Sequence, residues 1–275
     1  MPKIAAIQMT SVGSVERNLA AAHTLLERAR GAGATLAVLP ENFAIMGRTE
    51  AGKLAVSEPL GEGPIQAFLS RCAGELGMWI IGGTVPIRAD ERSNKVAAAS
   101  LVFDDQGRYV ARYDKIHLFD VDLPDREERY RESATIVPGN NVVVVPTPLG
   151  HVGLSVCYDV RFPELFRLLQ AQGAELLCVP AAFTAATGRA HWEVLLRARA
   201  IENLCYVIAP AQSGLHESGR ETWGDSMIVD PWGHVLDRVS DTGAGVAVAE
   251  IDRSFQKQVR DRFPSLSHRR FQVSL

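Results

Sequence analysis

Two segments of this chain follow the same order of elements, and that order limits the possible folds more than any other feature. Residues 3–9 form a short apolar run, residues 15–30 place apolar side chains at helical spacing, and residues 35–39 form a second apolar run. The order recurs where the apolar runs at 151–156 and 175–179 flank a helix that opens with a proline. Strand–helix–strand units of this kind favour a parallel sheet that is buried on both faces.

The two units are alike in detail as well as in order. Residues 33–40 and 173–180 share the pattern Gly-Ala-x-Leu-x-x-x-Pro, which we interpret as the general likeness of such units rather than as a duplication. We therefore expect an α/β fold with two similar halves. The chain has 275 residues, 47% of them hydrophobic, and no linker or low-complexity tract, so we expect one domain over residues 1–275.

The rest of the chain adds strands around these units. We expect a helix at 191–203 and strands at 78–85, 97–103, 108–113, 206–211, 226–230, 234–238 and 245–251. The stretch 122–132 is mostly charged, which is typical of a solvated loop.

Charge and cysteine content exclude several classes of function. The formal net charge of −3 gives no basic field for nucleic acid or an anionic membrane, and no apolar run reaches the roughly 20 residues that span a bilayer. The four cysteines include no C-x-x-C pair and no zinc-ligand spacing, which predicts no metal site and a reducing, cytoplasmic setting. The sequence also lacks a phosphate-binding loop, a dinucleotide fingerprint and a serine-nucleophile elbow.

Cys157 differs from the other three cysteines in its position. It ends an apolar strand, and a helix begins about six residues later, at Pro163. Sites in open parallel sheets lie at the carboxyl ends of strands, and a helix N-terminus favours the thiolate form of a cysteine. Cys72, Cys178 and Cys205 lie inside helical or apolar runs, where cysteine acts as a small hydrophobic residue. The pattern therefore indicates Cys157 as the nucleophile.

Two charged residues occupy comparable positions at strand ends. Glu41 follows the apolar run 35–39, and its apolar neighbours predict a raised carboxyl pKa, as suits a general base for a thiol. Lys115 follows the strand expected at 108–113, where a fixed ammonium group could stabilise an oxyanion. Taken singly, each residue is more often a solvated surface group. Their shared position at strand ends favours a catalytic role.

Two other interpretations stay open at this point. His117, His151 or His191 could be the base of a cysteine–histidine hydrolase, and Glu41 would then be dispensable. The other interpretation is a protein that keeps the fold but only binds a ligand. The presence of Glu41, Lys115 and Cys157 argues against it, because a site without a catalytic role need not keep these residues.

Three blocks of sequence around these residues resemble the signature blocks of the nitrilase superfamily of carbon–nitrogen hydrolases. They are Leu-Pro-Glu-Asn-Phe around Glu41, Tyr-Asp-Lys-Ile-His-Leu-Phe-Asp around Lys115, and Gly-Leu-Ser-Val-Cys-Tyr-Asp-Val-Arg-Phe-Pro-Glu-Leu around Cys157. The blocks occur in the family's order, and the match covers nearly the whole chain. The resemblance implies a four-layer αββα sandwich and a cysteine-dependent amidase that needs no cofactor.

The resemblance also implies roles for individual residues. The three strand-end residues would form a catalytic triad that hydrolyses a small carboxamide through a thioester. Glu132 falls on a second glutamate of the family and would orient Lys115 or the substrate, and the backbone N–H of Tyr158 would help to stabilise the oxyanion. Nitrilase-type relatives pair through the helix after the cysteine, here residues 163–172, and through their C-terminal segment, which predicts a homodimer or a higher homo-oligomer.

Within the superfamily, the chain is similar to the Nit branch. Residues 180–203 and 224–233 resemble deaminated glutathione amidases, which predicts deaminated glutathione as substrate. Amidases of omega-amides of 2-oxo acids and hydrolases of N-carbamoyl compounds share the catalytic groups and remain alternatives. The expected partner is a small amide substrate, with neither nucleic acid nor a membrane.

The substrate contacts are expected around the loop after the run 175–179. The candidate residues there are Phe183, Thr184, Thr187 and His191. Arg161 would bind a substrate carboxylate or, with equal weight, form an ion pair with an acid such as Glu164.

Overall fold

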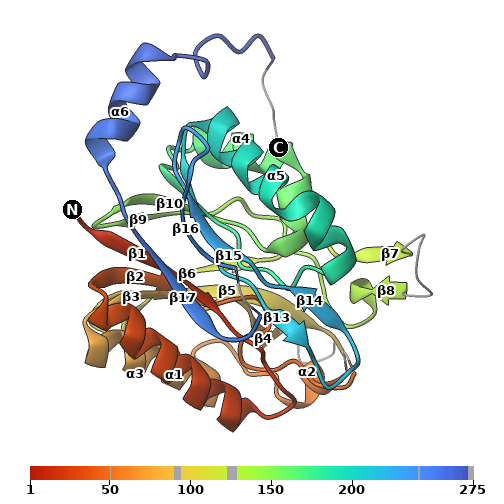
Figure 1. Ribbon diagram of the computed structural model, residues 1–275. Coiled ribbons are helices and arrows are strands. Elements are labelled where there is room, and N and C mark those ends of the chain that lie inside the picture. The colour runs from red at the N-terminus through yellow and green to blue at the C-terminus, as the bar shows by residue number, and fades with distance from the viewer. Residues whose placement is uncertain (50, 90–93, 123–128, 241, 272–275) are drawn as a thin grey trace.

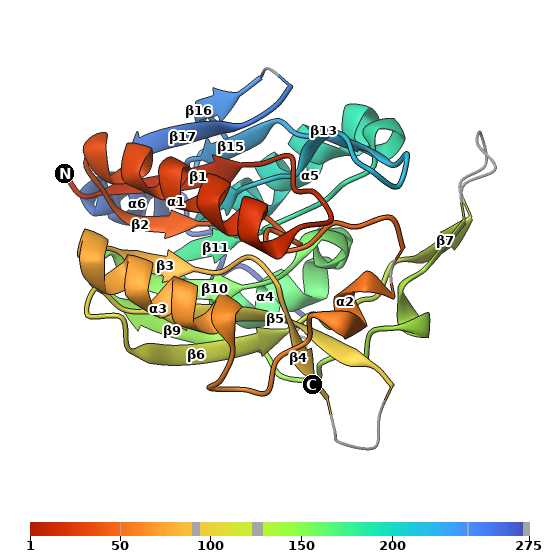
Figure 2. The same ribbon diagram turned by 90° about the horizontal axis from the view of Figure 1, so that it is seen from below.

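The computed structural model describes residues 1–49, 51–89, 94–122, 129–240 and 242–271. Two β-sheets pack face to face, and helices cover the outer face of each sheet (Figures 1 and 2). The order of layers is helix, sheet, sheet, helix. This order confirms the αββα sandwich predicted from the sequence.

The first sheet is built around the first strand–helix–strand unit. Its spatial order is β17-β1-β2-β3-β5-β4, and β6 pairs with β5. The described strands are β1 (Lys3–Gln8), β2 (Ala34–Val38), β3 (Trp79–Ile81), β4 (Val85–Arg88), β5 (Val96–Phe103), β6 (Tyr109–Asp114) and β17 (Gly245–Glu250). β1, β2 and β3 run parallel to one another, so their carboxyl ends reach the same edge of the sheet.

Helices α1 (Val15–Gly31) and α3 (Pro64–Leu76) cover the outer face of the first sheet (Figure 2). The side chain of Ser14 caps α1 by accepting a hydrogen bond from the backbone N–H of Arg17. α3 ends at Gly77, which adopts a left-handed conformation that glycine tolerates best.

The second sheet repeats the arrangement with the second unit. Its spatial order is β16-β15-β12-β11-β10-β9, and β10, β11 and β12 are parallel. The strands are β9 (Val144–Thr147), β10 (Gly150–Leu154), β11 (Leu176–Cys178), β12 (Tyr206–Ala209), β15 (Ser226–Val229) and β16 (Val235–Val239). Helices α4 (Pro163–Ala171) and α5 (Ala185–Asn203) cover its outer face (Figure 1).

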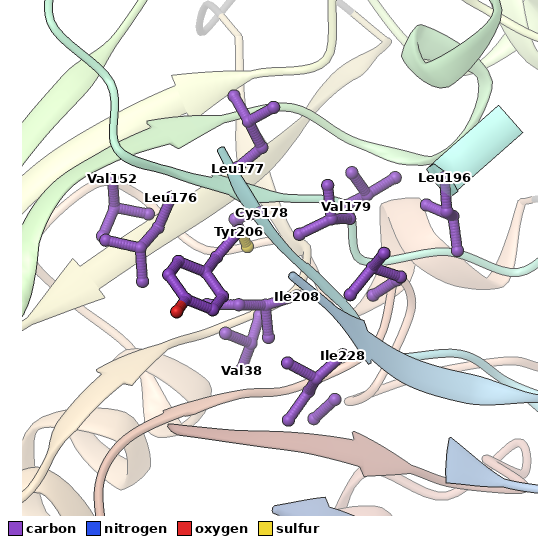
Figure 3. Packing of buried hydrophobic residues seen from close by; sticks show 14 of the residues in the cluster. Val38, Val152, Leu176, Leu177, Cys178, Val179, Leu196, Tyr206, Ile208 and Ile228 are labelled. Carbon is purple, nitrogen blue, oxygen red and sulfur yellow. The ribbon is translucent and has the colours of Figure 1, made fainter. Parts of the chain in front are cut away.

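The core between the two sheets joins side chains from both of them. Val38 of β2 belongs to the same packed cluster as Leu176 of β11 and Ile208 of β12, and all three are fully buried (Figure 3). Each such side chain stabilises the fold by about 1.5–3 kcal/mol relative to an exposed one. A second cluster, which includes Leu26 and Leu69, lies between the first sheet and its helices. These two layers of packing fix the position of the strand ends.

Smaller elements surround the sandwich. They are α2 (Gly52–Ala55), β7 (Asp120–Asp122), β8 (Arg129–Arg131), β13 (Ser213–Leu215), β14 (Glu221–Trp223), α6 (Arg253–Arg262) and the 3₁₀ helices η1 (Glu132–Ala134) and η2 (Cys157–Arg161). Much of the predicted charged loop lies outside the described residues, and its described ends pair as β7 and β8. Within the described part of the chain, no helix combines the length and apolarity that a membrane span requires.

Two expectations about elements were wrong in detail, and one helix was not expected. The strand expected at 78–85 is two strands, because Gly82 and Gly83 separate β3 from β4 and Gly83 has a φ of 41°. The helix expected at 191–203 begins at Ala185, where the side chain of Thr184 accepts a hydrogen bond from the N–H of Thr187. Helix α6 was not predicted, because only two of its side chains, Phe255 and Val259, are apolar.

Candidate active site

Glu41, Lys115 and Cys157 come together where the two sheets meet. Glu41 follows β2, Lys115 follows β6, and Cys157 begins η2 just after β10. Their exposed fractions are 3%, 2% and 7%. The ammonium of Lys115 lies 2.8 Å from Oε1 of Glu41, and the thiol of Cys157 hydrogen-bonds to the same carboxylate. The structure therefore juxtaposes the three side chains that sequence analysis selected.

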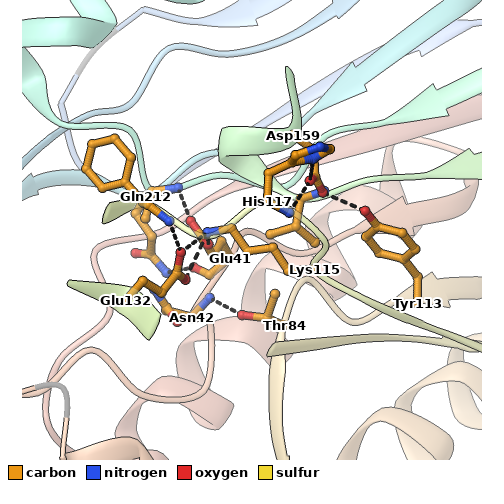
Figure 4. A network of polar contacts seen from close by, with 12 residues as sticks. Glu41, Asn42, Thr84, Tyr113, Lys115, His117, Glu132, Asp159 and Gln212 are labelled. Carbon is orange, nitrogen blue, oxygen red and sulfur yellow. Dashed lines mark hydrogen bonds and ion pairs between the residues drawn. The ribbon is translucent and has the colours of Figure 1, made fainter. Parts of the chain in front are cut away.

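Lys115 lies between two carboxylates (Figure 4). Its Nζ donates to Oε1 of Glu41 at 2.8 Å and to both oxygens of Glu132 at 2.9 and 2.8 Å. Burial alone would lower the pKa of the Lys115 ammonium, but attraction to Glu132 and Glu41 outweighs it and holds this pKa well above its ordinary value. Lys115 is therefore a permanent cation, and Glu132 orients it.

Backbone and side-chain contacts hold Glu41 from several directions. The N–H of Ala182 donates to its Oε2 at 2.9 Å, and Nε2 of Gln212 donates to its carbonyl at 3.0 Å. Burial works to raise the pKa of Glu41, but attraction to Lys115 and hydrogen bonds from Lys115 and Cys157 outweigh it, so this pKa lies below its usual value. The raised pKa expected from the apolar neighbours in sequence was wrong, because Lys115 decides the sign.

Cys157 adopts a backbone conformation that is rare for a non-glycine residue. Its φ is 48°, and its N–H donates to the carbonyl of Pro180 at 2.9 Å. Burial, with the negative charge of Glu41 added to it, raises the pKa of the Cys157 thiol. The expectation that a helix N-terminus favours the thiolate was therefore wrong for the resting protein. The thiol keeps its proton until a base accepts it.

Asp159 supports the turn that carries Cys157 (Figure 4). It is fully buried, and its Oδ2 accepts from the N–H of Val156 at 2.8 Å and from the hydroxyl of Tyr113 at 2.7 Å. Its Oδ1 accepts from the N–H of His117 at 3.0 Å and lies 2.7 Å from Nδ1 of the same ring. The carboxylate thus ties the residues on both sides of the nucleophile to β6 and to the segment that follows it.

Each histidine that was considered as an alternative base has another partner. His117 contacts Asp159, His151 contacts Glu175, and Nδ1 of His191 lies 3.2 Å from Nη1 of Arg161. Glu41, by contrast, contacts the thiol directly. The geometry favours Glu41 as the base.

A cavity of about 100 Å³ opens beside the thiol of Cys157. Its lining includes all three strand-end residues and most of the other predicted site residues, namely Glu41, Lys115, Glu132, Cys157, Tyr158, Arg161, Phe183, Thr184 and Thr187. His191 does not line it and reaches it only through Arg161, because its place in α5 turns it to the exposed side. The predicted direct contact of His191 with a substrate is therefore not supported.

Arg161 lies over two aromatic rings at one side of this cavity. Its guanidinium carbon is 5.0 Å from the ring centre of Phe183 and 5.8 Å from that of Tyr158. It forms no ion pair with Glu164 or with any other carboxylate among residues 1–49, 51–89, 94–122, 129–240 and 242–271. The cation is therefore available to an anionic group in the cavity.

Thr184 and Thr187 line the cavity but also hold each other. Their hydroxyl oxygens lie 2.8 Å apart, and Thr184 caps α5. Their first role is to set the start of this helix, and hydrogen bonds to a ligand would be additional.

Sequence analysis did not find several lining residues. These are Asn42, Lys53, Phe119, Arg129, Tyr130, Arg131, Ala182 and Arg220. They come from connecting segments that are far apart in the sequence, and no local pattern marks them. The one usable signal was the positive charge of Arg129 and Arg131 within a stretch that was interpreted as solvated.

The arrangement suits acyl transfer. A thiol, a carboxylate in contact with it and a buried ammonium group line one cavity, and these are the groups that acyl transfer to a thiol requires. Within the described part of the chain, no three His, Cys, Asp or Glu side chains lie in positions to hold a metal ion together.

Comparisons with known proteins agree with this chemistry. The family model of carbon–nitrogen hydrolases matches residues 3–261. The chain is 43% identical over 272 residues to the deaminated glutathione amidase of Yersinia enterocolitica, with 99% of this chain and 94% of that one covered. It is 46% identical over 271 residues to the deaminated glutathione amidase of Synechocystis sp. (strain PCC 6803 / GT-S), with 97% of each covered. The crystal structure of the C. elegans NitFhit protein is similar with a TM-score of 0.90 and 38% identity, over 99% of this chain and 66% of that longer chain.

Proposed function

The chain belongs to the carbon–nitrogen hydrolase family, and we propose that Glu41, Lys115 and Cys157 carry out its reaction on deaminated glutathione. As a member of this family it is a hydrolase of carbon–nitrogen bonds other than peptide bonds. The observation that carries the residue roles is the contact of one carboxylate, Glu41, with both the ammonium of Lys115 and the thiol of Cys157.

The first step is attack of the Cys157 sulfur on the amide carbon. At rest the proton lies on sulfur, because the pKa of the thiol is raised and that of Glu41 is lowered. Glu41 accepts this proton as the carbon–sulfur bond forms, so the thiolate does not accumulate before attack. This order protects the nucleophile from reaction when no substrate is bound.

Two donors face the oxygen that becomes negative in the tetrahedral intermediate. One is the ammonium of Lys115, and the other is the backbone N–H of Tyr158, in the first turn of η2, where backbone N–H groups lack helical acceptors. A donor of this kind contributes about 3–4 kcal/mol to transition-state stabilisation. Glu132 keeps Lys115 in place through two hydrogen bonds and is a positioning residue.

The intermediate then collapses to a thioester. The carbon–nitrogen bond breaks, and Glu41 passes its proton to the departing amine. Water, deprotonated by the same carboxylate, attacks the thioester carbon. The carbon–sulfur bond then breaks, the acid is released, and Glu41 returns the proton to the sulfur of Cys157. The cycle consumes one amide and one water.

Similarity to the two deaminated glutathione amidases supports the substrate assignment. The products would be 2-oxoglutarate and cysteinylglycine. The position of Arg161 supports a substrate with an anionic acyl group, since Arg161 lines the cavity beside Cys157 and has no carboxylate partner among the described residues. The wider proposal is a single-domain, cofactor-independent, cytoplasmic enzyme that forms at least a homodimer, and the four unpaired cysteines suit a reducing compartment.

The first experiment compares kcat/KM for deaminated glutathione with kcat/KM for the omega-amides of 2-oxoglutarate and 2-oxosuccinate. A hundredfold preference for deaminated glutathione, about 2.7 kcal/mol of transition-state discrimination, is expected. A preference of that size for an omega-amide would overturn the substrate and leave the residue roles intact.

The residue roles are tested by trapping the thioester. Rapid quench and intact mass spectrometry should show the acyl mass on Cys157 during turnover, and Cys157→Ala should show neither adduct nor activity. Cys178→Ala is the matched control, because Cys178 is buried in β11 and away from the cavity. Activity in Cys157→Ala above background would contradict the mechanism.

A further inference from the structure

A second, larger cavity continues outward from the one that holds Cys157. Its volume is about 430 Å³, and it shares five lining residues with the first: Asn42, Lys53, Arg129, Tyr130 and Arg220. Its outer part is lined by Arg48, Thr49 and Ser218, which are exposed. A substrate whose scissile bond lies at Cys157 could therefore extend past Asn42 into this outer cavity and toward solvent.

The charges that line the outer cavity have one sign. Arg48, Lys53, Arg129 and Arg220 line it, and no carboxylate does so among the described residues. The inner cavity differs because its lining includes two carboxylates, Glu41 and Glu132, both paired with Lys115. An anionic group that enters the outer cavity meets a positive field and donors for charge-assisted hydrogen bonds.

Arg220 is placed to act at the junction between the two cavities. Its guanidinium lies 5.1 Å from the ring centre of Tyr130 and donates a hydrogen bond to the carbonyl of Ala182. Its Nε is buried and has no hydrogen-bond partner among the described residues. A buried N–H without an acceptor is costly, and an oxygen of a bound ligand would satisfy it.

We propose that the outer cavity, lined by Arg48, Lys53, Arg129 and Arg220, binds a carboxylate at the far end of the leaving amine. The inference rests on the proposed function, because it assigns the two ends of the same substrate. The carboxylate of the acyl group lies on the Arg161 side of the inner cavity. The carboxylate of the leaving amine lies in the outer cavity. Two extended residues span about 7 Å, which suits a dipeptide that reaches from the scissile nitrogen into the second cavity. The enzyme is then selective for amides of anionic amines over amides of ammonia or neutral amines.

The test uses a pair of substrates that differ only at the far end of the leaving group. These are deaminated glutathione and its C-terminal amide, in which the glycine carboxylate is a neutral carboxamide. The wild-type kcat/KM should be at least about tenfold higher for the carboxylate, which corresponds to about 1.4 kcal/mol. Arg48→Gln and Arg220→Gln should each bring this ratio toward one.

The ratio of the two kcat/KM values distinguishes loss of the subsite from a general loss of active enzyme, because a general loss lowers both values by the same factor. Arg28→Gln, at an exposed position of α1, is the matched control and should keep the wild-type ratio. Since Arg220 also contacts Ala182, Arg48→Gln gives the readout if the Arg220 variant fails to fold.

The possible outcomes distinguish failure of the subsite from failure of the proposed function. Equal wild-type rates on the two substrates would overturn the subsite and leave the proposed function standing. A wild-type preference that survives in both variants would also overturn the subsite. Turnover of omega-amides but of neither glutathione derivative would overturn the proposed function, and the subsite with it, because no extended amine would then be accepted.

Discussion

At the scale of single residues, Lys115 pairs with both carboxylates that line the inner cavity. It is 2% exposed and pairs with the buried carboxylate of Glu41 and the partly buried one of Glu132, so Lys115→Met should lower the free energy of unfolding by about 3–5 kcal/mol near neutral pH. Without Lys115, the burial that raises the pKa of Glu41 is no longer outweighed. A carboxyl group with a raised folded-state pKa destabilises the protein above its unfolded pKa, and the penalty is relieved as pH falls. The loss should therefore be smaller near pH 5 than near pH 7.5.

Urea unfolding at the two pH values measures this prediction for Lys115→Met. Lys257→Met is the control, because Lys257 pairs with Asp261 on the surface of α6, where such a pair contributes about 0–1 kcal/mol. Equal effects of the two substitutions would show that the buried cluster does not depend on the ammonium.

The protonation of the triad also predicts a pH profile for the reaction. The pKa of Glu41 is lowered below 4.5, while the pKa values of Cys157 and Lys115 are raised, so none of the three titrates between about pH 5.5 and 8. We expect a flat kcat/KM over this range, measured with circular dichroism at each pH to verify folding. A histidine base with an ordinary pKa near 6.5 would instead lose about tenfold between pH 7.5 and 5.5. Such a loss would revive the cysteine–histidine alternative.

The sequence was sufficient to select three residues that the structure brings together, but not to describe their electrostatics. Glu41, Lys115 and Cys157 each follow a recognisable strand, and strand ends converge in this type of sheet. The pKa of Glu41 depends on Lys115, which is 74 residues away, and no local pattern reports that contact. Arg220 was missed for the same reason, since the fold alone brings it to the cavity.

At the scale of elements, the turn between β3 and β4 fixes the strand end that carries Glu41. Gly83 has a φ of 41°, and a Cβ there would lie 2.0 Å from the carbonyl oxygen of Pro40. Gly83→Ala should therefore displace the segment from Pro40 to Glu41 and lower kcat at least about tenfold, since a misplacement of about 1 Å costs roughly a hundredfold. This turn also explains why one predicted strand is two.

Gly77→Ala isolates the effect of that contact. Gly77 also has a positive φ, of 53°, but a Cβ there meets no atom within 4 Å. Both substitutions carry the left-handed penalty of about 1–2 kcal/mol, and only Gly83→Ala adds the clash. Thermal melting and kcat for the two variants measure the difference. Equal activity in both would show that the position of Glu41 does not depend on the β3–β4 turn.

At the scale of the whole molecule, the sandwich follows from its two strand–helix–strand units, whereas the C-terminal end does not. The four layers could be predicted because each unit has a strong apolar pattern and glycine or proline at its ends. Helix α6 and the described residues after it lie outside the layers (Figure 1), and Nη1 of Arg269 lies 3.5 Å from Oε1 of Gln170 in α4. Apolar patterns do not determine such a segment, because it buries few of its own side chains.

The apolar side chains of this end provide the last prediction. Phe263 is 51% exposed and Phe271 is 89% exposed, and Trp232 packs its ring 5.9 Å from that of Phe263 while remaining 51% exposed. Burying them against a second copy removes apolar surface from water and stabilises the pair by about 25 cal/mol per Å². We therefore expect light scattering at micromolar concentration to give at least twice the 29.9 kDa chain mass. Phe263→Glu should shift the distribution toward 29.9 kDa, and Leu60→Glu, at an exposed position elsewhere, should not. A monomeric wild-type protein would show that this apolar surface is not a contact between copies.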